Sequence, residues 1–140
     1  MLGVRAMLVT NFQEQLPREL PLGVNVFGYL PFSEVLPRAA LLVYHGGIGT
    51  LAQTLKAGIP HLVVPNGHDQ FDNAWRIEQL GLGRSIPQTR YRAGRAVEAI
   101  RALLSDAALR QRCREYATRV DSPTALRLAC ELIEGLTVRS

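Results

Sequence analysis

Short apolar runs alternate with stretches of helical periodicity along most of the chain. The apolar runs predict strands over residues 4–9, 24–29, 40–44, 61–64 and 84–86. Two of these runs, 40–44 and 61–64, are continuous rather than alternating. Because a strand covered on both faces carries apolar residues throughout, we expect both of them to be buried in a parallel sheet.

Helices are predicted between and after these strands. One short helix is expected to be capped by Ser33, and another to open at Thr50 and end at Gly58. A third covers residues 70–80. Three more follow from residue 93 onward, the last of them capped by Ser122 and ended by Gly135.

This alternation predicts an α/β fold, a Rossmann-like parallel sheet flanked by helices, with further helices at the C-terminal end. Right-handed crossovers place the carboxyl ends of parallel strands on one edge of the sheet, and ligands of open α/β sheets bind there. Three unusual segments fall at that edge, namely residues 29–32, 45–50 and 66–70.

The second of these segments is the glycine-rich turn His45-Gly46-Gly47-Ile48-Gly49-Thr50. Its glycines let the backbone approach a ligand, and the helix that follows offers unpaired N–H groups and the positive end of its dipole. His45 and Thr50 can add donors. The turn therefore predicts a phosphate or pyrophosphate site, although glycines needed only for tight packing are the alternative. Its spacing fits neither the Walker A loop nor the dinucleotide fingerprint.

The other two segments suggest contacts to the rest of a ligand. In Asn66-Gly67-His68-Asp69-Gln70, a carboxylate beside a carboxamide can pair with adjacent sugar hydroxyls, unless Asp69 serves only as a helix cap. One histidine near two carboxylates is too little for a metal site, so none is expected. In Tyr29-Leu30-Pro31-Phe32, an aromatic ring can stack on a base or belong to the core.

Taken together, these motifs resemble the donor-site signature of UDP-glycosyltransferases. The matching residues are the turn at 45–50, Ala57-Gly58-Ile59-Pro60, Val64-Pro65, His68-Asp69-Gln70 and Asn73-Ala74. The chain is similar to the C-terminal, donor-binding half of GT-B fold enzymes, close to bacterial rhamnosyltransferases and to sterol and macrolide glycosyltransferases. The roles that the resemblance implies are diphosphate binding by His45, Gly46, Gly47, Gly49 and Thr50, ribose binding by Gln53, base binding by Tyr29, Leu30 and Phe32, and sugar binding by His68, Asp69 and Gln70.

The resemblance also implies a reaction, the inverting transfer of a hexose from a UDP- or dTDP-sugar to a hydroxyl of a lipid or small molecule, without a metal or other cofactor. The base is expected in an N-terminal acceptor domain. That domain and the first strand–helix unit of the donor domain are not found in residues 1–140, so no catalytic residue is assigned here. The isolated chain is expected to be inactive and to need that domain in cis or in trans. Two alternatives stay open, a non-catalytic nucleotide-binding subunit that partners an acceptor-domain chain, and a nucleotide-sugar epimerase.

Size and composition narrow the partners. A length of 140 residues suits one domain, here 1–140 as a single donor-binding domain. There is no long apolar run and no secretory signal, so a cytoplasmic location is expected. The net charge of +4 comes from scattered arginines, which argues against nucleic acid and leaves peripheral contact with an anionic membrane as a hypothesis. Cys113 and Cys130 are expected to be semi-buried thiols.

Overall fold

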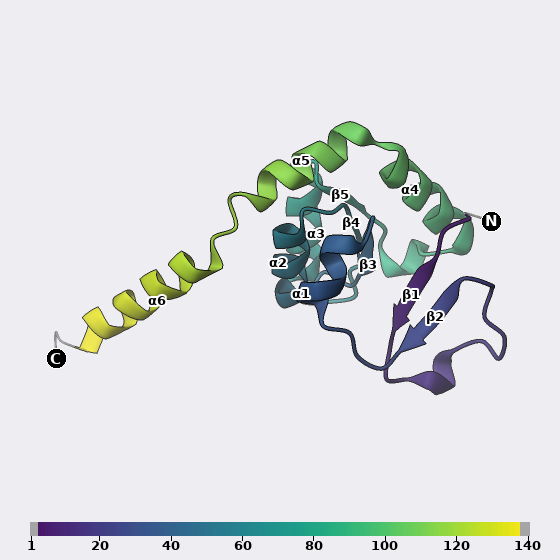
Figure 1. Ribbon diagram of the computed structural model, residues 1–140, viewed down its shortest axis with the longest axis horizontal. Coiled ribbons are helices and arrows are strands. Elements are labelled where there is room, and N and C mark those ends of the chain that lie inside the picture. The colour runs from purple at the N-terminus through teal and green to yellow at the C-terminus, as the bar shows by residue number, and fades with distance from the viewer. Residues whose placement is uncertain (1–2, 138–140) are drawn as a thin grey trace.

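The secondary structure follows the predicted alternation. The computed structural model describes residues 3–137 (Figure 1). The strands are β1 (Ala6–Val9), β2 (Val24–Phe27), β3 (Leu42–Tyr44), β4 (His61–Val63) and β5 (Gly83–Ser85). The α-helices are α1 (Phe32–Val35), α2 (Ile48–Ala57), α3 (Gln70–Gln79), α4 (Ala93–Ser105), α5 (Ala107–Ala117) and α6 (Ser122–Thr137). Short 3-10 turns lie at Gln13–Gln15, Leu36–Arg38 and Gln88–Arg90.

The strands form two sheets, in which every pairing is parallel. β1 pairs with β2, while β3, β4 and β5 form a three-stranded sheet with β4 in the centre. Helices pack around the three-stranded sheet, as Figure 1 shows. The predicted α/β class and the parallel sheet flanked by helices are thus confirmed, with β1 and β2 set apart as a separate pair.

The core lies around β4. Leu62 and Val63 are completely buried, and Ile77 of α3, Leu103 of α4 and Cys113 of α5 belong to the same cluster. Each buried aliphatic side chain of this size contributes about 1.5–3 kcal/mol relative to exposure. The predicted burial on both faces is therefore confirmed for β4.

The same prediction was wrong for β3. Val43 in its middle is 39% exposed, and its two neighbours in the strand are half-buried. The physical reason is position, because β3 is an edge strand of its sheet and has β4 on one side only. β1 shows the same discrepancy more strongly, since all four of its residues are exposed although they are all apolar.

Several helix boundaries differ from the predicted ones. Ser33 lies inside α1, which Pro31 precedes as N-cap, and α2 begins at Ile48 rather than at Thr50. Asp121 rather than Ser122 caps α6, since its Oδ1 accepts a hydrogen bond from the Thr124 N–H at 3.1 Å. In each case a neighbouring residue met the backbone geometry of the cap first, which is the usual error of one or two residues. Gly58, with φ of +68°, does end α2 as predicted.

Helix α6 projects away from the body in Figure 1. It continues past Gly135, where we expected it to end, and runs to Thr137. Cys130 on this helix is exposed and Cys113 in the core is buried, so neither thiol is semi-buried as expected. None of the helices in the described part of the chain is both long enough and apolar enough to span a membrane.

Candidate functional site

The glycine-rich turn connects β3 to α2 and takes its shape from the neighbouring strand. Gly46 has φ of +95°, a value that L side chains rarely adopt. A β-carbon at this position would also lie 2.7 Å from Cγ1 of Val63 on β4. Both observations require glycine, so the packing of the central strand fixes the backbone at the start of the turn.

The next residue, Gly47, leaves room for the ring of His45. A β-carbon on Gly47 would fall 2.5 Å from His45 Nε2, so the imidazole lies directly against the turn. Gly47 is the N-cap of α2, and no side chain caps the helix. Because the first N–H groups of a helix have no partner within it, α2 begins with donors that point out of the turn, beside an exposed histidine.

The loop before α3 is held closed by Gln70. Its Oε1 accepts hydrogen bonds from the backbone N–H of Asn66 at 2.8 Å and of Gly67 at 3.2 Å. His68 has φ of +55°. Left-handed backbone is uncommon for a residue other than glycine, and here the closed loop keeps His68 in it.

Asp69 occupies the N-cap position of α3 but does not act as a cap. Its side chain makes no hydrogen bond to the helix backbone, so the alternative that Asp69 is only a helix cap was wrong. The carboxylate instead accepts a hydrogen bond through Oδ2 from Asn73 Nδ2 at 2.9 Å. The same nitrogen donates to the carbonyl oxygen of Gly46, also at 2.9 Å.

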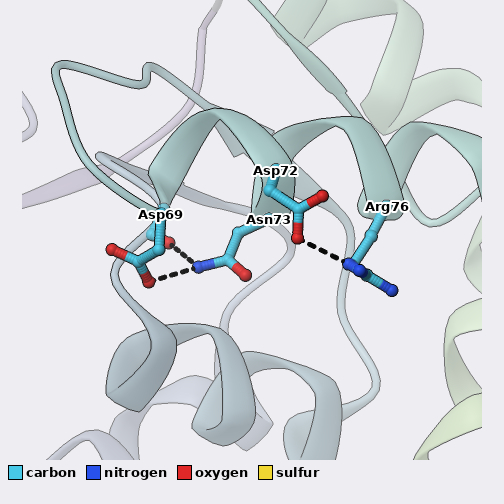
Figure 2. Close-up of polar contacts among 5 residues, drawn as sticks. Asp69, Asp72, Asn73 and Arg76 are labelled. Carbon is cyan, nitrogen blue, oxygen red and sulfur yellow. Dashed lines mark hydrogen bonds and ion pairs between the residues drawn. The ribbon is translucent and has the colours of Figure 1, made fainter.

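Asn73 thereby joins the glycine-rich turn to the Asp69 loop. Figure 2 shows its amide directed toward the Asp69 carboxylate, whereas Asp72 and Arg76 on the same helix form an exposed ion pair at 2.7 Å. Asn73 belongs to one of the motifs that carry the resemblance, but no binding role was predicted for it. The signal available in the sequence was a polar residue beside Ala74 and one helical turn after Asp69.

The residues predicted to bind the ribose and the base lie on α2, at the start of α1 and after β2. Gln53 is exposed on α2, one turn after Gly49. Leu30 and Phe32 are half-buried, and the helix that begins at Phe32 packs against α2. Tyr29 follows β2 of the separate sheet and is 80% exposed, so it is not a core residue.

Comparisons with known proteins place this arrangement in a family. Residues 5–134 match the family described as Erythromycin biosynthesis protein CIII-like, C-terminal domain. The chain belongs to this family. It is 29% identical over 122 residues to the NDP-glycosyltransferase YjiC of Bacillus subtilis, covering 87% of this chain and 31% of that protein. It is 33% identical over 104 residues to O-mycaminosyltylonolide 6-deoxyallosyltransferase of Streptomyces fradiae, covering 74% and 25%.

Solved structures agree with this assignment. The glycosyltransferase of kitacinnamycin superposes with a TM-score of 0.82 at 29% identity, over 93% of this chain and 34% of that one. SsfS6 of Streptomyces sp. SF2575, complexed with thymidine diphosphate, superposes with a TM-score of 0.62 at 27% identity, over 71% and 26%. The chain therefore spans about a third or less of the length of these relatives. All four of these relatives are named as transferases, and none of the four is named as an epimerase.

A buried polar pair lies at the end of β3, directly before the glycine-rich turn. The Tyr44 hydroxyl and His61 Nδ1 are hydrogen-bonded at 2.9 Å across β3 and β4. Burial lowers the pKa of His61 to about 4 and raises the pKa of Tyr44. Both side chains are therefore neutral near pH 7, and they hold the end of β3 directly before His45. Residues 61–64 alone predict only an apolar strand, so the sequence does not reveal this pair.

No metal centre is evident in the part of the chain that the structure describes. Among residues 3–137, no three histidine, cysteine or acidic side chains are grouped so that they could hold an ion. Two surface hollows, lined by residues such as Arg84 and Arg95 or Arg119 and Leu128, lie away from the turn. The candidate site is thus an open edge made by the turn, the start of α2 and the Asp69 loop.

Proposed function

We propose that this chain is the donor-binding half of an inverting glycosyltransferase that transfers a hexose from a UDP- or dTDP-sugar to an acceptor hydroxyl. One observation carries the proposal. The uncapped start of α2, suited to a diphosphate, is joined through Asn73 to Asp69, suited to a sugar, by two hydrogen bonds of 2.9 Å.

The leaving group is the nucleoside diphosphate, and its growing negative charge is what this half has to stabilise. Backbone N–H groups of Gly47 to Thr50 and the helix dipole supply fixed positive potential there, and the His45 ring adds a donor from the side. The proposal includes no metal or other cofactor, since preorganised N–H donors act on charge as it develops.

The sugar is held by Asp69 and Gln70 in this proposal, with His68 beside them. The Gln70 oxygen is already engaged by two loop amides, which leaves its Nε2 amino group to donate to a sugar oxygen. The Asp69 carboxylate accepts from Asn73 through one oxygen and can accept from a sugar hydroxyl through the other. A hydrogen-bond donor on Gln70 and a hydrogen-bond acceptor on Asp69 are thus next to each other.

The nucleoside is proposed to lie along α1 and α2. Gln53 contacts the ribose, while Tyr29, Leu30 and Phe32 contact the base. The thymidine diphosphate named in the SsfS6 complex supports a dTDP-sugar, and the name of the Streptomyces fradiae relative supports a small-molecule acceptor. Competition between UDP and dTDP decides the base.

The acceptor half and the catalytic base are proposed to come from polypeptide outside residues 1–140, in cis or in trans. We propose that a first strand of the donor domain also lies outside these residues, and the edge of β1 supports that part of the proposal. Ala6 and Thr10 donate their N–H groups to β2, so the N–H and C=O groups of Met7 and Val9 point away from it. Val43 of β3 faces outward in the same way, because Leu42 and Tyr44 bond to the β4 side. A further parallel strand between β1 and β3 would satisfy these groups.

Calorimetric titration of the chain with UDP, dTDP and their glucose derivatives tests the donor site. We expect millimolar or tighter binding, weakened about tenfold by His45→Ala, the loss expected for one hydrogen bond to a charged group. Arg76→Ala is the matched control, because it removes an exposed cation on α3 and should leave the affinity unchanged. If none of these nucleotides binds to the chain, the proposal is overturned.

Transfer itself is tested by co-expressing the chain with the N-terminal part of a relative such as YjiC and following release of nucleoside diphosphate. We expect transfer only from the pair. Robust transfer by the isolated chain would contradict the assignment of the base to a separate half.

A further inference from the structure

Asn73 is the side chain that connects the two halves of the candidate site, and its surroundings make that connection specific. It is 8% exposed and lies on α3 one turn after Asp69. A side-chain amide has two N–H hydrogens, and Nδ2 directs them to two acceptors that are 23 residues apart in the chain, the Gly46 carbonyl and Asp69 Oδ2. Both bonds are 2.9 Å long (Figure 2).

The Gly46 carbonyl has no freedom to compensate for loss of this amide, and the exposed Asp69 carboxylate would lose the bond that orients it. The Gly46 carbonyl belongs to a backbone that Val63 and a positive φ hold in place, as described above. The Asp69 carboxylate makes no hydrogen bond to the backbone of α3, so the Asn73 side chain is the partner that sets its direction. Leaving a partly buried acceptor unpaired is costly, which is why removing one member of such a bridge disturbs both ends.

We propose that Asn73 is a positioning residue that couples the diphosphate turn to the sugar-holding carboxylate, so that the phosphate and sugar parts of the donor bind cooperatively. The inference rests on the proposed function. Asn73 itself contacts neither part of the donor. It acts by fixing the distance between the turn and Asp69, and by keeping Asp69 Oδ1 directed to the ligand.

The test compares nucleoside diphosphates with their sugars. For each protein, the affinity for UDP-glucose or dTDP-glucose is divided by the affinity for UDP or dTDP. We expect Asn73→Ala to lower this ratio about tenfold, as for loss of a hydrogen bond to a charged group. Asp72→Asn is the matched control, because it removes the charge of an exposed ion pair on the same helix and should leave the ratio unchanged.

A purely structural role gives a different result. If Asn73 only stabilises the fold, its replacement lowers the affinity for both ligands by the same factor, and that outcome overturns the inference. A double-mutant cycle with Asp69→Ala sharpens the test. Once Asp69 is gone, Asn73→Ala should no longer change the ratio, because it acts through Asp69.

A readout without nucleotide separates failure of the inference from failure of the proposed function. Three backbone amides report on the two segments, those of Leu51, bonded to Gly47, and of Asn66 and Gly67, bonded to Gln70. In Asn73→Ser, which keeps a polar group too short to bridge both acceptors, we expect faster hydrogen exchange at both segments while the β4 amides stay protected. Unchanged exchange at the Leu51 amide would overturn the coupling, even if the wild-type chain binds no nucleotide.

Discussion

Replacing Gly46 by alanine tests how the turn is built, and its cost can be worked out from two separate terms. Forcing alanine into left-handed backbone costs about 1–2 kcal/mol. The new methyl group would lie 2.7 Å from Val63 Cγ1 and 3.3 Å from the Gln70 carbonyl oxygen, and overpacking of this kind costs about 1–3 kcal/mol. We therefore expect Gly46→Ala to lower the free energy of unfolding by about 2–5 kcal/mol.

Thermal and urea denaturation followed by circular dichroism measures this loss. Gly49→Ala is the matched control in the same turn, because a β-carbon there meets nothing within 4 Å and the position is helical. Alanine is the better helix former, so this control should be neutral or up to about 1 kcal/mol more stable. A difference between the two variants isolates the backbone and the contact at Gly46 from the general effect of adding a methyl group.

Val63→Ala separates the two terms. Shortening Val63 removes the contact with the new methyl group but not the backbone strain. The double variant should therefore be about 1–3 kcal/mol more stable than the sum of the single changes predicts. Strict additivity, or a Gly46→Ala variant as stable as wild type, would refute the reasoning that the central strand fixes the turn.

Three further predictions follow from buried groups and caps. Burial lowers the pKa of His61 to about 4, so below about pH 6.5 the unfolded chain binds a proton that the folded chain does not bind. The free energy of unfolding should therefore fall between pH 6.5 and 4 by about 3 kcal/mol more in wild type than in His61→Gln. Parallel pH profiles of the two proteins would contradict this. Asp106→Ala removes the cap that accepts from the Leu109 N–H at 2.8 Å and should cost about 1 kcal/mol in urea denaturation, whereas Asp72→Ala on the exposed helix face should leave the melting temperature unchanged. In thiol labelling near pH 8, Cys130 should react at once and Cys113 only on unfolding, because burial raises the pKa of Cys113 to about 11; rapid labelling of both would show that the core opens.

Local pattern predicted the elements of this fold well and their surroundings less well. The apolar run at β4 predicted a buried strand correctly, since helices cover it on both faces. An equally apolar run at β3 gave the same prediction wrongly, because burial of a strand depends on which strand pairs with its other edge. That information lies outside the run itself.

The site shows the same division. Glycines at 46 and 47 and the pair Asp69-Gln70 were identified from residue type and spacing, and the structure brings the two segments together. The Asn73 bridge and the Tyr44–His61 pair were missed, because each joins positions that meet only once β3 and β4 are in register. The ligand-binding roles assigned to the glycine-rich turn and to Asp69-Gln70 stay predictions that the titrations above decide.

The hydrogen bonds of Gln70 to its own loop determine how its side chain can contact the proposed sugar. With its oxygen committed to two backbone amides, this side chain offers hydrogens, while the neighbouring Asp69 offers only lone pairs. Two adjacent hydroxyls on a hexose fit this asymmetric pair in one orientation, with one giving and the other receiving. A donor deoxygenated at either carbon loses one of the two contacts, so the polarity of a single amide limits which sugars this half can hold well.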